Sequence, residues 1–161
     1  MVKRKMILIS VLVAAVLSAG VSFLPGSAQA ANSYVGTATC AGCHDKEYAN
    51  FSKFAKKAHS DRSIKVMAKK LTPEEVKECY ACHTTGYGQP GGFESFEKTP
   101  DLAHAGCEVC HGPGSAHVDA GGTKALIKGK GRMNVKECEK CHSSERVSNF
   151  RFKPMLYGGA H

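Results

Sequence analysis

The stretch that decides the fold of this chain runs from His104 to His117 and reads H-A-G-C-E-V-C-H-G-P-G-S-A-H. It contains a C-x-x-C-H motif, in which two cysteines three positions apart are followed directly by a histidine. The motif occurs three more times, and the four copies use all eight cysteines of the chain. The copies comprise Cys40, Cys43 and His44; Cys79, Cys82 and His83; Cys107, Cys110 and His111; and Cys138, Cys141 and His142.

Each motif has the spacing of a covalent haem c attachment site. In an exported chain, the two thiols of C-x-x-C-H add to the vinyl groups of a porphyrin, and the histidine binds its iron. Histidine accounts for 8 of the 161 residues. A histidine after all four cysteine pairs would therefore arise by chance in about one such chain in a hundred thousand. The sequence predicts four covalent haem c groups, each with one iron.

Other uses of paired cysteines explain less of the pattern. Structural zinc sites do not require a histidine after every cysteine pair. A disulfide between cysteines separated by two residues is strained and leaves the histidines unexplained. Thioether cysteines and iron-bound histidines are not available as nucleophiles, so no catalytic residue is predicted. Three acidic residues beside the motifs, Glu108, Glu137 and Glu139, are predicted to be solvated or paired with lysine.

The first thirty residues are typical of an export signal. A basic run at 3–5 is followed by an apolar run from Met6 to about Leu17 and by the small-residue sequence A-Q-A at 28–30. The apolar run is too short to span a bilayer, and helix breakers separate it from the cleavage site, which argues against an uncleaved anchor. We expect 1–30 to be a cleaved signal peptide and 31–161 to be one tetrahaem domain without a transmembrane segment, located in the periplasm or outside the cell.

The expected mature chain of 131 residues is poor in core-forming side chains and has no Trp. A chain of this size is at the margin for a conventional apolar core. Four porphyrins would supply the missing apolar bulk, with about 33 residues of polypeptide for each haem. We predict a mostly α fold with long loops, a multihaem cytochrome c in which short helices wrap around four stacked covalent haems. Without them the chain should be largely unfolded.

The formal charge of +8 does not indicate a nucleic-acid partner. Removal of the expected signal peptide takes away three basic side chains and leaves +5. Each ferric haem adds about one positive charge and about two negative propionates, which brings the loaded protein to roughly +1. Lysines near haem edges would pair with propionates or steer an acidic redox partner.

Helix signals lie between the motifs. Apolar residues at helical spacing predict amphipathic helices over 45–59 and 61–71. The capping sequence T-P-E-E begins a helix over 72–83 that carries the second motif. A capping asparagine begins a short helix over 134–142 that ends in the fourth motif. The glycine-rich segment 84–100 is predicted to be a loop.

Four histidines do not follow a cysteine: His59, His104, His117 and His161. Four irons each have one further axial position, so the equal counts predict bis-histidine ligation and low-spin irons of low potential. The equality is not a proof, because one histidine could be free and one iron open. Saturated irons reorganise little and offer substrates no site, which favours an electron carrier over an enzyme.

Three stretches around the motifs resemble a known family. They are Y-V-G-T-A-T-C-A-G-C-H at 34–44, C-Y-A-C-H-T-T-G-Y-G-Q-P-G-G-F at 79–93 and G-C-E-V-C-H-G-P-G-S-A-H at 106–117. They are similar to the cytochrome c-554 family of tetrahaem cytochromes. The resemblance extends over nearly the whole of 31–161. It is specific around the second and third motifs and looser from residue 120 onward.

This resemblance implies a mostly helical fold in which the haems stack in parallel and perpendicular pairs. It also implies three ligand pairs: His117 opposite His44 on the first haem, His161 opposite His111 on the third, and His59 opposite His142 on the fourth. In the type member of the family, the second haem has no sixth ligand from the protein. Whether His104 binds the iron of His83 therefore stays open.

Three functions are compatible with the sequence. The first, which we expect, is an exported electron carrier between redox partner proteins. The second is the reduction of a small nitrogen oxide at an open second haem, which predicts a high-spin iron that binds carbon monoxide or nitric oxide. The third is self-assembly into an extracellular cytochrome filament, in which His104 or His161 ligates the iron of a neighbouring chain.

Overall fold

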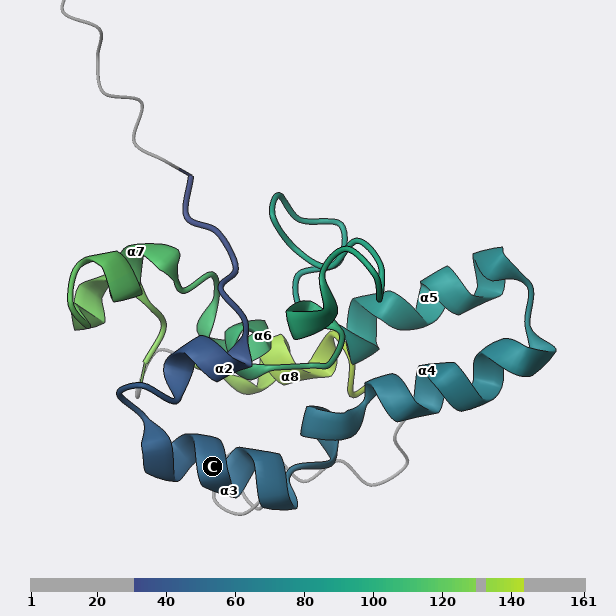
Figure 1. The fold of residues 1–161 in the computed structure, drawn as a ribbon, viewed down its shortest axis with the longest axis horizontal. Coiled ribbons are helices and arrows are strands. Elements are labelled where there is room, and N and C mark those ends of the chain that lie inside the picture. Colours follow the sequence, from purple (N-terminus) through teal and green to yellow (C-terminus); the bar gives the residue numbers. More distant parts are fainter. Residues whose placement is uncertain (1–30, 130–132, 144–161) are drawn as a thin grey trace, which may run out of the picture. The chain divides into compact units, whose positions relative to one another are not determined.

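The structure is a computed structural model that describes residues 31–129 and 133–143. These residues belong to a unit that spans Ala31–His161. They form short helices joined by loops, and no strand occurs in the two described ranges (Figure 1). No helix within them is long and apolar enough to cross a membrane. The predicted mostly α fold with long loops is confirmed.

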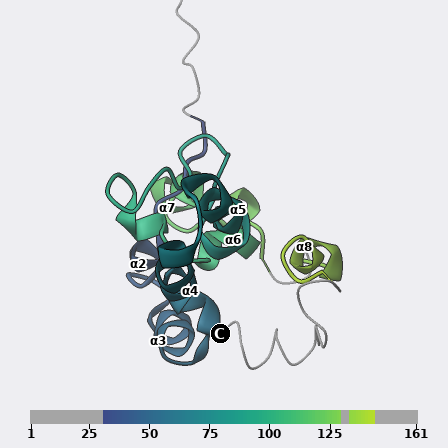
Figure 2. The same ribbon diagram turned by 90° about the vertical axis from the view of Figure 1, so that its right-hand side faces the viewer.

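The described elements are α2 (Thr37–Cys40), α3 (Asp45–Phe54), η1 (Lys56–His59), α4 (Asp61–Met67), η2 (Ala68–Lys70), α5 (Pro73–His83), η3 (Pro100–Leu102), α6 (Cys107–His111), α7 (Ser115–Asp119), η4 (Lys124–Leu126) and α8 (Val135–Glu139), where η marks a 3₁₀ helix. The consecutive helices α4 and α5 pack against each other, and α2 contacts both α3 and α6 (Figures 1 and 2).

Two helices begin where the capping sequences predict. At the start of α5, the Glu75 N–H donates to Thr72 Oγ1 at 3.3 Å, and the Thr72 N–H donates to Glu75 Oε2 at 2.8 Å. These reciprocal bonds satisfy two backbone donors that the first turn of a helix leaves open. At the start of α8, Asn134 Oδ1 accepts the Lys136 N–H at 2.9 Å. Both predicted helix starts are confirmed.

The continuous helix predicted over 45–59 is wrong, because α3 ends at Phe54. The next residue, Ala55, is buried and extended, with φ −81° and ψ 117°. The break turns η1 back, so that His59 Nε2 lies 3.0 Å from Ser52 O. Residues seven apart on a straight helix are about 10 Å apart along its axis, so an unbroken helix would prevent this contact. The segment predicted over 61–71 is confirmed as α4 followed by η2.

An aromatic cluster packs the loop that follows α5. The Tyr80 ring meets the rings of Tyr87, Phe93 and Phe96 edge to face, with centroids 5.2, 5.1 and 6.1 Å away. Edge-to-face contact is a favoured arrangement of aromatic pairs. The loop is held at its base, where the Thr85 N–H donates to Leu102 O at 2.9 Å. The loop predicted over 84–100 therefore forms, although η3 already begins at its last residue.

Glu108 ties three parts of the chain together from inside α6. Its side chain is 3% exposed. Oε1 accepts the N–H groups of Val35 at 3.0 Å and Gly114 at 2.7 Å, and Oε2 accepts the Gly36 N–H at 2.9 Å. The expectation that Glu108 is solvated is wrong, because two loops direct N–H donors at its carboxylate. The expectation for Glu137 is confirmed by its contact with Lys128 Nζ at 2.5 Å.

We predict that Glu108→Gln destabilises the haem-loaded protein by about 2 kcal/mol or more, because an amide NH₂ would face buried N–H donors and the charge would be lost. Glu139, which follows the first cysteine of the fourth motif as Glu108 follows that of the third, is exposed. Glu139→Gln is therefore the matched control. Chemical denaturation followed by circular dichroism checks the difference, and equal midpoints for both variants would contradict it.

Candidate haem attachment and iron ligation sites

All four C-x-x-C-H motifs lie on a turn of helix. The second motif forms the end of α5, and the third forms the whole of α6. In the first and fourth motifs, the N–H groups of His44 and His142 donate to the carbonyls of Cys40 and Cys138, each at 2.9 Å. The helical i to i+4 pattern therefore continues past α2 and α8. One such turn presents two thiols and an imidazole from positions i, i+3 and i+4 of one face.

Thiols of different motifs meet in pairs. None of the eight cysteines forms a disulfide. A hydrogen bond between Cys40 and Cys107 lowers the pKa of Cys107 and raises that of Cys40. Burial, together with a hydrogen bond to Cys82, raises the pKa of Cys141 to about 12. The structure therefore brings the first motif to the third, and the second to the fourth.

Three candidate ligands have Nδ1 bonded to a backbone carbonyl. His83 Nδ1 lies 3.2 Å from Ser60 O, His111 Nδ1 lies 2.6 Å from Lys128 O, and His117 Nδ1 lies 3.1 Å from Thr123 O. A carbonyl only accepts hydrogen bonds, so these contacts require a hydrogen on Nδ1. The lone pair of each neutral ring is then on Nε2, where a metal can bind.

The rings of His44 and His117 are spaced as two ligands of one metal would be. Their centroids are 6.4 Å apart, and their planes differ by 19°. Two imidazoles on opposite sides of a metal, each bonded at about 2 Å, have centroids about 6 Å apart. This geometry fits an iron between the two residues.

His59 and His104 line one cavity of about 300 Å³ between α2, α3, η1 and η3. His104 Nε2 lies 3.1 Å from Thr37 Oγ1, and its ring centroid is 6.3 Å from that of Phe51. Burial is the main cause that lowers the pKa of His104. The Nε2–H of His59 donates to Ser52 O, so the lone pair of the neutral ring is on Nδ1. These two histidines therefore differ from the three that leave Nε2 open.

The structure accounts for some site residues and not for others. His161, the predicted partner of His111, lies outside the described residues.

Sequence reasoning did not find two residues that hold the site, Thr37 and Ser60. Thr37 Oγ1 accepts the Cys107 N–H at 3.3 Å and contacts His104, while Ser60 contacts His83. Their only sequence signal is that hydroxyl side chains often bond to backbone groups.

Two sequence comparisons match this chain to one family of cytochromes. The family model described as "Cytochrome c554 and c-prime" matches residues 39–112. Cytochrome c-554 of Nitrosomonas europaea is 34% identical over 92 residues, which cover 50% of this chain and 39% of the relative. The chain thus spans about two fifths of the length of that relative.

A solved structure is similar in fold. It is the reduced state of cytochrome c554 from Nitrosomonas europaea, which superposes with a TM-score of 0.56 over 80% of this chain and 85% of the other, at 22% identity. Helical turns that carry C-x-x-C-H motifs on such a fold define a multihaem c-type cytochrome. The chain is similar to the cytochrome c-554 family over residues 39–112. This similarity, together with the motifs, supports covalently attached haem c with iron.

We predict that acid destabilises the protein through His104. Because burial holds its folded-state pKa below the ordinary value of 6.5, the unfolded chain binds the proton more tightly. Stability should therefore fall as the pH drops through about 6.5 toward 5. Thermal melts of the wild type and of His104→Gln across this range check the prediction. The variant should show the shallower pH dependence, and parallel curves would contradict it.

Proposed function

We propose that this protein is an exported electron carrier in which four covalent haem c groups pass electrons between redox partner proteins. Residues 1–30 act as the signal peptide, and 31–161 act as the tetrahaem domain in the periplasm or outside the cell. The observation that carries the proposal is that helical turns of different motifs lie against each other: α2 contacts α6, and Cys141 Sγ lies 4.0 Å from the carbonyl oxygen of Ala81 in the second motif. Each thiol would become part of a haem edge, so these contacts would bring haem edges close together.

The proposed proximal ligands are the four histidines of the motifs. His117 is proposed as the second ligand on the iron of His44, and the 6.4 Å centroid distance between the two rings supports this assignment. His59 and His161 are proposed as the second ligands of the fourth and third haems, on the basis of the family resemblance. His59 would bind through Nδ1, because its Nε2 is bonded to Ser52 O.

The exposed apolar side chains support a large apolar cofactor. Among residues 31–129 and 133–143, six large ones are 40–67% exposed: Phe54, Val66, Met67, Val109, Val118 and Leu126. One of them, Val109, lies between the two cysteines of the third motif. Porphyrin faces would cover such side chains and supply the core that the polypeptide lacks.

One observation favours a second function, the reduction of a small ligand such as a nitrogen oxide at the second haem. His104 Nε2 is already within 3.1 Å of Thr37 Oγ1. If that contact persists in the loaded protein, His104 does not bind the iron of His83 and one axial position stays open. Binding of carbon monoxide to the reduced wild type would support this function, and a fully low-spin protein that binds none would support the carrier alone.

The carrier proposal predicts a product with the added mass of four haems when the chain is exported from a host that attaches haem c. Intact-mass spectrometry and a haem-stained gel check the count. Replacement of both cysteines of one motif by alanine should remove one haem and leave three. A colourless wild-type product from such a host would refute the proposal.

We predict that His117→Ala converts one iron in four from low-spin to high-spin while the haem count stays at four, because the covalent bonds are intact and one axial ligand is lost. Electron paramagnetic resonance of the oxidised protein checks this.

The variant His104→Ala tests whether His104 binds the iron of the second haem. It should create a new carbon monoxide site if His104 is a ligand, and it should leave ligand binding unchanged if the second haem is already open.

A further inference from the structure

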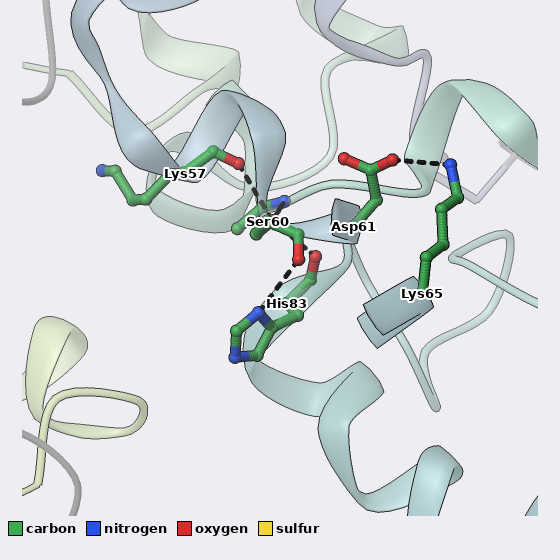
Figure 3. A network of polar contacts seen from close by, with 6 residues as sticks. Lys57, Ser60, Asp61, Lys65 and His83 are labelled. Atoms are coloured by element: carbon green, nitrogen blue, oxygen red, sulfur yellow. Dashed lines mark hydrogen bonds and ion pairs between the residues drawn. The ribbon is translucent and has the colours of Figure 1, made fainter. Parts of the chain in front are cut away.

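Ser60 lies at the junction of three segments that carry candidate iron ligands. It separates η1, which ends at His59, from α4, and its side chain is half-buried. Figure 3 shows Ser60 between the end of η1 and the end of α5, with the ring of His83 beside it. The third segment is the one that links η3 to α6 and contains His104.

Ser60 holds His83 at two points. Its hydroxyl Oγ donates to the His83 carbonyl at 2.7 Å, and its own carbonyl accepts from His83 Nδ1 at 3.2 Å (Figure 3). The first bond fixes the backbone at the end of α5, and the second fixes the rotation of the ring. Together they require hydrogen on Nδ1 and leave the Nε2 lone pair available.

The same hydroxyl also holds the segment of His104. Ser60 Oγ accepts the N–H of Ala105 at 2.9 Å, and Ala105 is buried with 4% exposure. A hydroxyl has one hydrogen to donate. Although Lys57 O lies 2.9 Å from Oγ, that carbonyl already accepts the Ser60 N–H at 3.1 Å, and the shorter contact is to His83 O. Oγ therefore bridges His83 and Ala105 as donor to one and acceptor from the other.

We propose that Ser60 is a positioning residue for the second haem: its hydroxyl and carbonyl orient His83 and tie it to the segment that carries His104. The proposal rests on the proposed function, because it treats His83 as an iron ligand. A hydrogen bond from Nδ1 to a carbonyl makes an imidazole a stronger donor to its metal. A stronger donor stabilises the ferric state, so Ser60 should lower the potential of this one haem.

The test uses the haem-loaded full-length product and compares Ser60→Ala with Ser60→Thr, which keeps the hydroxyl. The control is Ser63→Ala, an exposed serine three residues along the chain. Ser60→Ala keeps the backbone carbonyl but loses the hydroxyl bonds to His83 O and to the Ala105 N–H, which hold the end of α5 against Ser60. The bond from His83 Nδ1 to the Ser60 carbonyl should then lengthen, so we expect the midpoint potential of one haem in four to rise and the paramagnetic resonance signal of one iron to change. Ser60→Thr and Ser63→Ala should both keep the wild-type potentials and signals.

Other outcomes also decide between the possibilities. Four haems with wild-type potentials and signals in Ser60→Ala would overturn the proposal. If Ser60→Ala lacks a haem, peptide mass spectrometry locates the loss: loss from Cys79 and Cys82 supports the proposal, and loss from another motif overturns it.

If no Ser60→Ala product accumulates, the isosteric pair Ser60→Thr and Ser60→Val, which differ in the hydroxyl, is compared by the same measurements. A rise in one potential in Ser60→Val alone supports the proposal, and equal potentials in the pair overturn it. A wild type with fewer than four haems would instead refute the proposed function, so the two failures are distinguishable.

Discussion

The geometry of one helical turn is the constraint on which this fold depends. A C-x-x-C-H motif can present two thiols and an imidazole together only if its backbone is helical over those five residues, because positions i, i+3 and i+4 share a face only in a helix. Four such turns occur in a unit of 131 residues. Outside these turns, the described residues build a small apolar cluster around Phe93 and Leu102. Much of the remaining chain serves to place the turns relative to one another.

Buried polar side chains do much of that placing. Glu108 receives backbone N–H groups from the lead-in to α2 and from the turn after α6, and thereby joins the first and third motifs. Ser60 joins the end of α5 to the segment before α6. Hydrogen bonds to buried groups are costly to leave unmade. Such hydrogen bonds can therefore hold loops in place where too few apolar side chains pack together to do so.

The sequence predicted what depends on a few neighbouring residues and missed what depends on distant ones. The caps at Thr72 and Asn134 are local, and both form as predicted. Glu108 and Glu139 follow the first cysteine of their motifs in the same way, yet only Glu108 is buried. The difference comes from the N–H donors of Val35 and Gly36, more than seventy residues away in the chain, together with that of Gly114, six residues on. The break at Ala55 was also missed, because apolar spacing continues through it and does not reveal the extended backbone that ends α3 at Phe54.

Five of the histidines divide into two groups by the nitrogen that the chain engages. His83, His111 and His117 bond through Nδ1 to backbone carbonyls, which do not change identity when side chains are substituted. His59 and His104 engage Nε2 instead, and both line the cavity between α2 and α3. The backbone therefore orients the first group for a metal, whereas the Nε2 of His104 is held by a single hydroxyl. Under the proposed function, the difference between a saturated carrier and an open second haem would therefore depend on the cavity that His104 lines.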